Sequence, residues 1–267
     1  FNFTEAATCA KQLTDINPHH PLAAQLLGHS YLTQKDPRSA LEVITPALKR
    51  YPKNRELIAL AAAAETLRYN DEAAAEHLRQ FAQLSPVNPV AYYTVGEYLS
   101  LARQYPEAEA ALRKAIELRP TWPAPHIELG LLLMQSGDDV GAHLALLQAT
   151  QLDQFNRRAA NQLTLINELL SYETIETEHF IIRYRAGVDE ALARDMPDRL
   201  EKIYDTVTRA FEHQPRNKTQ IELMPDEQWF GVRITGMPWI WTIGACTGDV
   251  IAITPPNASV ETNLGRY

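Results

Sequence analysis

Residues 21–54, PLAAQLLGHSYLTQKDPRSALEVITPALKRYPKN, decide the fold, because their pattern of small residues and proline recurs every 34 residues along the chain. The stretch holds Gly28, then Ala40 twelve residues later and Pro52 twenty-four residues later. The first slot recurs as Ala62, Gly96 and Gly130, the second as Ala74, Ala108 and Ala142, and the third as Pro86 and Pro120, with Gln154 in the fourth proline slot. An internal period of this length is typical of a repeat protein built from stacked units.

Each repeat is predicted to be a pair of antiparallel helices. Small residues allow two helix axes to approach closely, and proline cannot continue the second helix because it lacks the amide hydrogen. One such pair cannot bury its apolar face alone, so neighbouring pairs must stack. The predicted units are a partial repeat at 1–20, full repeats at 21–54, 55–88, 89–122 and 123–156, and a capping helix at 157–172.

The pattern resembles the tetratricopeptide repeat (TPR) family. The residues that carry the resemblance are Leu27-Gly28-His29-Ser30-Tyr31, Val95-Gly96 and Leu129-Gly130, each followed by its alanine slot. The resemblance implies an all-α TPR superhelix of helix hairpins over residues 1–172. It also implies a scaffold that binds a protein or peptide partner.

In TPR proteins the first helix of each repeat lines a concave groove, and the resemblance implies which side chains face it here. The candidate groove residues are Gln25, His29, Glu56, Tyr93, Glu97 and Ile127. Repeat position also places Ala59 and Ala63 there. The Lys, Asn and Arg set with which some TPR domains bind a terminal carboxylate is absent, so that ligand is not expected. Two alternatives stay open: these are ordinary helix residues, or the array docks the second half of its own chain as a spacer.

Composition limits the classes of partner and compartment. The net charge is −8, shared equally between the two halves of the chain, so the clustered cations that nucleic acid requires are missing. No apolar run approaches the roughly 18–20 residues of a membrane span. Cys9 and Cys246 form no disulfide framework or zinc-ligand spacing. A reducing compartment such as the cytoplasm fits, and export is left open.

The helical repeat pattern stops near Tyr172, and residues 173–267 are predicted to form a small α+β unit. Strands are expected at 177–184, 220–224 and 250–254, the last stopped by Pro255-Pro256. A helix is expected at 189–213, where apolar residues recur at three- and four-residue steps. A Gly- and Trp-rich loop is expected from Trp229 to Gly244, with Trp239 and Trp241 inside it. Three strands and one helix leave a sheet face uncovered, so something more should pack on it.

This order of elements resembles the front portion of a peptidase-MA-like (gluzincin) zinc metallopeptidase domain. The resemblance rests on Glu178 to Tyr184, Ile221 to Phe230 and the Gly244-Ala245 turn. It implies that Gly244, Ala245, Cys246 and Thr247 form an edge strand that pairs with extended substrate backbone. The alternative for these four residues is a plain turn.

No catalytic or metal-binding residue is predicted in this chain. None of the eight histidines begins an H-E-x-x-H motif, which supplies two zinc ligands and a general base in such enzymes. Two functions therefore remain. The chain is a TPR scaffold for protein or peptide binding fused to an incomplete metallopeptidase-like domain, without a cofactor of its own. Alternatively, it is the N-terminal part of a TPR-containing zinc metallopeptidase whose catalytic helix lies beyond Tyr267.

Overall fold

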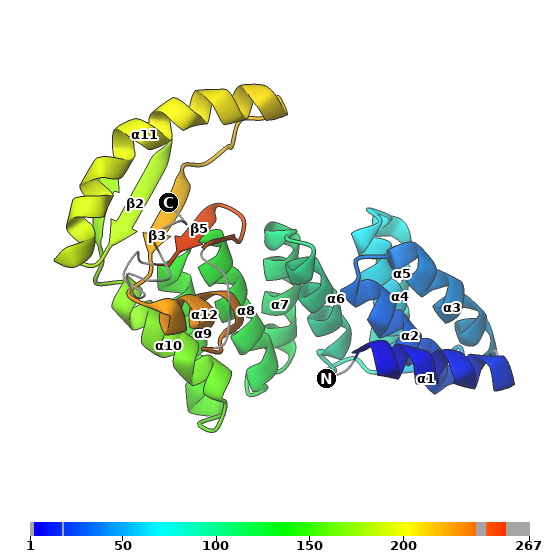
Figure 1. Ribbon diagram of the computed structural model, residues 1–267. Coiled ribbons are helices and arrows are strands. Elements are labelled where there is room, and N and C mark those ends of the chain that lie inside the picture. Colours follow the sequence, from blue (N-terminus) through cyan, green and yellow to red (C-terminus); the bar gives the residue numbers. More distant parts are fainter. Residues whose placement is uncertain (1–2, 18, 239–243, 255–267) are drawn as a thin grey trace. The chain divides into compact units, whose positions relative to one another are not determined.

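The computed structural model describes residues 3–17, 19–238 and 244–254, and these form twelve helices and five strands (Figure 1). Trp239, Trp241 and the Pro255-Pro256 pair lie outside the described residues. The chain separates into two compact units, residues 1–128 and 129–267, and each is described by itself.

The first unit is an array of helix hairpins. Its helices are α1 (Phe3–Ile16), α2 (Pro21–Thr33), α3 (Pro37–Arg50), α4 (Arg55–Leu67), α5 (Asp71–Leu84), α6 (Val90–Leu101), α7 (Tyr105–Leu118) and the first part of α8 (Pro123–Ser136). Each predicted full repeat within this unit holds one first helix and one second helix. The second helices α3, α5 and α7 each end two residues before the proline slot, as proline's missing amide hydrogen requires.

The turns recur with the same period as the sequence pattern, whereas N-cap side chains bond the starts of some helices and not those of α5, α6 and α7. The side chains of Asp36 and Asn54 accept hydrogen bonds from backbone amides at the starts of α3 and α4. The turns between the two helices of each repeat contain a residue with positive φ, at Lys35, Tyr69, Arg103 and Gly137. A left-handed residue reverses the chain between antiparallel helices, and only Gly137 takes that conformation without steric cost.

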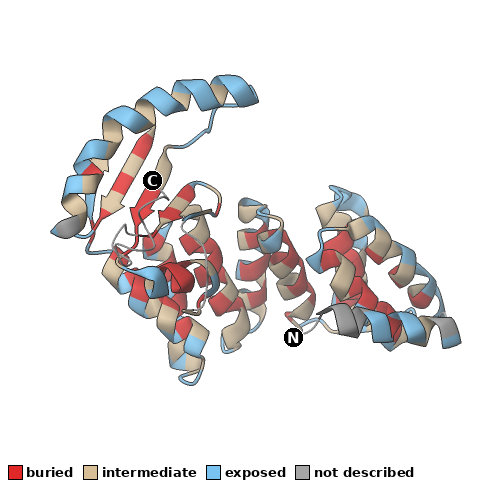
Figure 2. Cartoon of the chain, viewed as in Figure 1, coloured by how far each residue is buried: buried red, intermediate tan, exposed pale blue. Residues whose placement is uncertain are grey.

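The small-residue slots lie where the helices of a repeat cross. Ala40, Ala74, Ala108 and Ala142 are all buried. The glycine slots face a bulky side chain of the second helix, because a Cβ on Gly28, Gly96 or Gly130 would lie 3.0, 2.7 or 2.6 Å from Ile44, Leu112 or Leu146. The sequence prediction of close helix crossings at these slots is therefore confirmed. Figure 2 shows how buried and exposed stretches alternate along the helices.

The second unit combines the end of the array with a mixed sheet. It holds the rest of α8, then α9 (Asp139–Leu152), α10 (Arg157–Leu169), α11 (Val188–Phe211) and α12 (Glu227–Thr235). The strands are β1 (Glu173–Glu176), β2 (Phe180–Tyr184), β3 (Thr219–Leu223), β4 (Gly244–Cys246) and β5 (Val250–Ile253), in the spatial order β1-β2-β3-β5-β4. The central pairs β2–β3 and β3–β5 are parallel, and the two outer pairs are antiparallel.

Helix α11 covers one face of this sheet, as Figure 1 shows. Ile182, Tyr184 and Leu223 from the strands pack with Ala193 in one buried cluster, to which Leu192, Met196 and Leu200 add. Because side chains alternate along a strand, Arg183 and Glu222 point to the opposite face. The sheet unit therefore has two covered faces, and the element predicted to be missing from the second face is supplied within the chain.

Two sequence predictions about this unit are wrong. The strand expected at 177–184 begins only at Phe180, as β2, because the Thr177 amide bonds the carbonyl of Phe180 and turns the chain; the strand β1 before this turn was not predicted. The loop expected from Trp229 to Gly244 begins as helix α12, since Asp226 caps the amide of Trp229 and Gly236, at φ 80°, ends the helix. The predicted count of three strands and one helix becomes five strands and two helices within the described part of residues 173–254.

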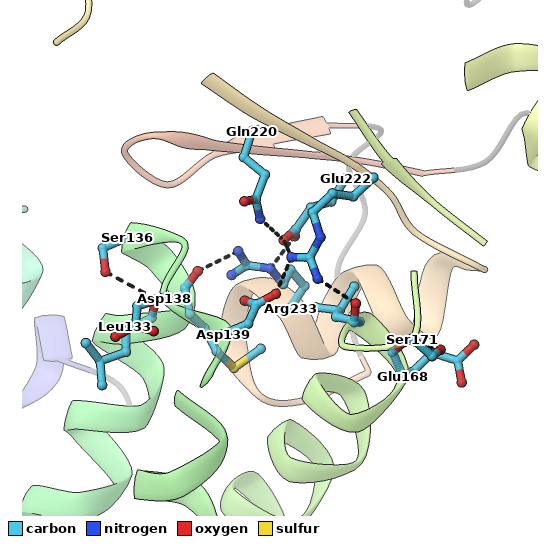
Figure 3. A network of polar contacts seen from close by, with 12 residues as sticks. Leu133, Ser136, Asp138, Asp139, Glu168, Ser171, Gln220, Glu222 and Arg233 are labelled. Carbon is cyan, nitrogen blue, oxygen red and sulfur yellow. Dashed lines mark hydrogen bonds and ion pairs between the residues drawn. The ribbon is translucent and has the colours of Figure 1, made fainter. Parts of the chain in front are cut away.

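A buried ionic network joins α12, the sheet and the last repeat (Figure 3). Arg233 and Glu222 are both fully buried, and the Arg233 Nε donates to Glu222 Oε2 at 2.6 Å. Arg233 Nη2 donates to the carbonyl of Met134 on α8, also at 2.6 Å. Arg183 bonds Glu222, Asp139 on α9 and the carbonyl of Leu169 on α10. Two cations and two carboxylates thus balance in one interior site.

Burial shifts the pKa of one member of this network, Asp139. Desolvation raises the pKa of Asp139, the nearby Glu222 carboxylate raises it further, and Arg183 opposes both effects. Taking charges out of water costs free energy that only complete pairing offsets. The network links α8, α9 and α10 to the sheet and α12 through buried charges, and Asp139 Oδ1 and Arg233 Nη1 have no hydrogen-bond partner within it.

Candidate peptide-binding face

The predicted groove residues come from α2, α4, α6 and α8, and we call their surface the first-helix face. Its members in the first unit are Gln25, His29, Glu56, Tyr93, Glu97 and Ile127. The structure brings two subsets together and separates a third. These three arrangements decide which part of the face could contact a partner.

The first subset centres on His29, which bridges three repeats. Its Nδ1 lies 2.5 Å from the hydroxyl of Tyr98 on α6, and its Nε2 lies 3.1 Å from Glu56 Oε1 on α4. The His29 and Glu56 side chains are about two-fifths exposed, at 40% and 39%. Gln25 Nε2 donates to Oδ1 of Asn54, the residue that caps α4. This polar cluster therefore ties α2 to α4 and α6.

Helix α4 explains how residues two repeats apart can meet. Every residue from Leu57 to Ala64 is buried, and five of these eight are alanines. Helices α2 and α6 consequently contact each other as well as α4. Ala59 and Ala63, expected to line the groove, are instead fully covered. At α4 the first-helix face is covered by side chains of the array itself. The small alanine side chains allow the neighbouring helices to pack closely there.

The second subset is aromatic and acidic and lies on α6. The rings of Tyr93 and Trp122 are 4.8 Å apart at 57°, a tilted packing typical of aromatic pairs. Both residues are half-buried. Glu97 is one helical turn beyond Tyr93 and shares its side of α6. An apolar surface with an adjacent carboxylate is thus presented at one place on this face.

Ile127 forms the third arrangement. Its side chain is 7% exposed, so little of it remains for contact with another molecule. The preceding His126 is also buried, and its Nε2 lies 2.9 Å from the carbonyl of Pro120. Ile127 therefore contributes packing at the start of α8.

The polar cluster perturbs the ionisation of its own members. The hydrogen bond from His29 lowers the pKa of Glu56 in spite of partial burial, and burial raises the pKa of Tyr98. A carboxyl whose pKa is lowered by folding stabilises the folded state above its unfolded pKa, and this stabilisation is lost as pH falls through the folded pKa.

We expect Glu56→Gln to destabilise the array near pH 6 and to approach the wild type near pH 3. The two proteins become similar at low pH because a protonated glutamate and a glutamine are both neutral at residue 56. Urea unfolding at both pH values measures the difference, with Glu107→Gln, an exposed glutamate on α7, as control. A difference between Glu56→Gln and wild type that is the same at both pH values contradicts the expectation.

The second predicted site, Gly244 to Thr247, belongs to the second unit. Gly244 to Cys246 form strand β4 at one edge of the sheet, with Gly244 opposite Ile253 and Cys246 opposite Ile251. The opposite edge, β1, carries Glu173 and Glu176, and charged residues on an edge strand oppose pairing with another chain. Strand β4 carries no charge. Thr247 is buried, and its amide bonds the carbonyl of Val250.

Two residues important to the first-helix face were not predicted from sequence. Tyr98 lies one position beyond Glu97, outside the repeat positions that the TPR resemblance assigns to the groove. Trp122 is the last residue of its repeat, before the next first helix begins. A large aromatic residue at a repeat junction is the one sequence signal that indicates packing against a neighbouring first helix.

Comparison with known proteins identifies the repeat. Residues 89–121 match the model of the tetratricopeptide repeat. These residues cover α6 and α7, and the other helix pairs share their 34-residue spacing and a small residue at the helix crossing. The chain therefore contains a TPR repeat at residues 89–121, within an array of similarly spaced helix pairs that a small sheet unit follows. No curated protein matches the sequence.

Several solved structures are similar to part of the chain. A thermophilic TPR protein in Thermus thermophilus is 18% identical, with a TM-score of 0.49, over 62% of this chain and 91% of that one. A MamA protein is 23% identical, with a TM-score of 0.38, over 62% and 82% of the two chains. PilF of Pseudomonas aeruginosa is 19% identical, with a TM-score of 0.40, over 63% and 77%.

The remaining chemistry of the described residues is sparse. Among them, no group of three or more His, Cys, Asp or Glu side chains is placed to hold a metal ion. No described helix is both long enough and apolar enough to cross a membrane. Cys9 and Cys246 are both exposed, and the Cys246 thiol lies 3.3 Å from the carbonyl of Gly248.

Proposed function

We propose that the chain is a TPR scaffold that binds a polypeptide segment on its first-helix face, at the α6 surface formed by Tyr93, Glu97 and Trp122. The observation that carries the proposal is the half-buried Tyr93–Trp122 pair with Glu97 one turn away. Aromatic anchors dominate the binding energy of protein interfaces, and an adjacent carboxylate favours a basic residue in the partner. The partner is therefore a segment with an apolar side chain next to a lysine or arginine.

The hydrogen bonds of the polar cluster around His29 favour the α6 surface, and not the cluster itself, as the binding location. Gln25, His29 and Glu56 are occupied with Asn54 and Tyr98, so a partner there would have to replace existing hydrogen bonds. A partly buried polar group that loses its hydrogen bond costs free energy unless the ligand or water restores the bond. An apolar side chain that packs on the aromatic rings of the α6 surface needs no hydrogen bond of its own, because ring faces bind through contact. The net charge of −8 supports a polypeptide partner over nucleic acid.

We expect Tyr93→Ala to weaken binding of peptides selected on the full-length chain from a random peptide library by at least about 30-fold, the range of an interface anchor. Calorimetric titration measures the affinity. Tyr51→Ala removes an exposed tyrosine on the turn after α3 and serves as the matched control. Tyr93→Phe keeps the ring and should bind nearly as the wild type does.

Glu97→Ala should weaken binding less, by about 3- to 10-fold, because an ion pair near solvent contributes little. This loss is expected only for peptides that contain a basic residue, with which Glu97 can pair. Selected peptides that bind both alanine variants of the α6 surface with wild-type affinity would place the binding surface elsewhere. Circular dichroism should show that each variant retains its helices. A variant that binds more weakly but keeps its helices has lost contacts with the peptide and not its fold.

A second proposal concerns β4. We propose that the sheet unit can accept an extended polypeptide strand at this edge, as the resemblance to the front portion of a metallopeptidase domain implies. The contrast between the uncharged edge β4 and the acidic edge β1 supports the proposal. A longer parent chain with an H-E-x-x-H helix would make this edge a substrate strand. Zinc is not assigned to residues of this chain, because the described ligating side chains do not cluster.

A further inference from the structure

Helix α9, the second helix of the fourth repeat, carries an exposed aliphatic stripe. Val140, Leu144 and Leu147 are 64%, 62% and 38% exposed. They lie at steps of four and three residues, so they share one face of the helix. The opposite face holds Ala142, Ala145, Leu146 and Ala149, all buried. Helix α9 is therefore apolar on its inner and outer faces, a property typical of a helix that is covered on both.

The other three full repeats show what this outer face normally carries. Each of them places at least one charged residue at the three equivalent positions, and none has a large aliphatic side chain there. The equivalents of Val140 are Arg38, Glu72 and Pro106, those of Leu144 are Glu42, Glu76 and Ala110, and those of Leu147 are Thr45, Arg79 and Arg113, all exposed. The fold thus accepts charge on this face, and the fourth repeat has aliphatic side chains instead. Core packing does not account for the difference, because the side chains face solvent.

Charge indicates which molecule covers the stripe. From Val140 to Leu152 the helix has no Asp, Glu, Lys or Arg, although the whole chain carries −8. Two copies of the chain repel one another through acidic surfaces, and the outer face of α9 is a place where two copies can meet without opposed like charges. An uncharged stripe is also complementary to itself across a two-fold axis, as a symmetric dimer requires.

We infer that the outer face of α9 is a homodimer surface, in which the α9 helices of two copies pack antiparallel with Leu144 near the two-fold axis. Leu144 lies between Val140 and Leu147, so the antiparallel arrangement places Val140 of one copy near Leu147 of the other. Phe155, 94% exposed three residues beyond the end of α9, extends the apolar surface at that end. The surface consists of a few side chains on one helix, so we expect a weak dimer with a dissociation constant on the order of micromolar.

Sedimentation velocity of the full-length chain from about 1 to 200 µM tests the inference. The wild type should shift from monomer to dimer across this range. Leu144→Glu gives the fourth repeat the residue that the first two full repeats have at this position, so it should fold, and it should raise the dissociation constant at least about 100-fold through opposed carboxylates. Leu101→Glu, at an aliphatic residue that is 46% exposed on α6, is the matched control and should leave the dimer intact.

Mixing variants identifies the partner as a second copy. Leu144→Lys alone should also be monomeric, whereas an equimolar mixture of Leu144→Glu and Leu144→Lys should form a heterodimer, because opposite charges then meet at the axis. A wild type that stays monomeric at about 200 µM would overturn the inference. So would a dimer that Leu144→Glu leaves unchanged, or a mixture of the two charged variants that stays monomeric. None of these results depends on peptide binding at α6.

Discussion

Replacing Glu222 with leucine is expected to lower the free energy of opening of the sheet unit by about 3–5 kcal/mol, the usual cost of breaking a fully buried ion pair from one side. The Glu222 side chain accepts hydrogen bonds from Arg233, Arg183 and Gln220. Without it, Arg233 keeps its bond to the carbonyl of Met134 but becomes a fully buried cation that no described carboxylate contacts directly, although Asp139 lies in its vicinity. Arg183 still has Asp139, so the loss falls mainly on α12 and β3.

The matched control removes both charges. Glu222→Leu with Arg233→Met should recover at least half of the loss, because apolar residues of similar volume replace a desolvated pair at little net cost. Hydrogen exchange at the amides of β2 and β3 measures the opening free energy locally, which avoids assuming that the two units unfold together. A loss below about 1 kcal/mol for the single variant, or no recovery in the double variant, would show that the Glu222–Arg233 pair does not hold the sheet unit together.

The helix pairs were predictable because the information that specifies them is local and repeated. Glycine or alanine at the crossing and proline after the second helix act within one repeat, and four copies of the pattern reinforce each other. The turn conformation was less predictable. Gly137 indicates a left-handed residue, but Lys35, Tyr69 and Arg103 adopt the same conformation with side chains that disfavour it. At these positions packing of the two helices outweighs local preference.

Contacts between distant residues explain what the sequence did not reveal. The Arg233 side chain bonds a carbonyl 99 residues away, and His29 meets Tyr98 over a separation of 69 residues. Neither pair has a spacing motif, because a single sequence records periodicity along the chain and not the curvature that brings α2 to α6. Helix α12 was missed for a different, local reason. Its cap, Asp226, and its terminating Gly236 are visible in the sequence, but the tryptophan and glycine content of the segment favoured a loop.

Replacing Gly96 with valine is expected to lower the stability of the first unit by about 3 kcal/mol, at the upper end of overpacking effects. A Cβ at residue 96 would lie 2.7 Å from Leu112 Cγ and 2.8 Å from its Cδ2, and the Ala108 carbonyl is 3.3 Å away. Valine adds two methyl groups to this contact, so α6 and α7 must separate and disturb the stacking of their neighbours.

The rescue of that variant tests the repeat architecture itself. The double variant Gly96→Val/Leu112→Ala lacks the Leu112 atoms that clash with the valine. We expect it to be more stable than Gly96→Val alone, although it also loses a buried leucine side chain. Urea unfolding of the single and the double variant measures the difference. Leu112→Ala alone should destabilise, because it leaves a cavity where Leu112 is now fully buried. Leu112→Ala is thus expected to destabilise the wild type but to stabilise Gly96→Val. This opposite effect requires that residues 96 and 112 lie at the same helix crossing. Additive losses in the double variant would mean that the two residues do not meet, and the helix-pair model of the third repeat would then fail.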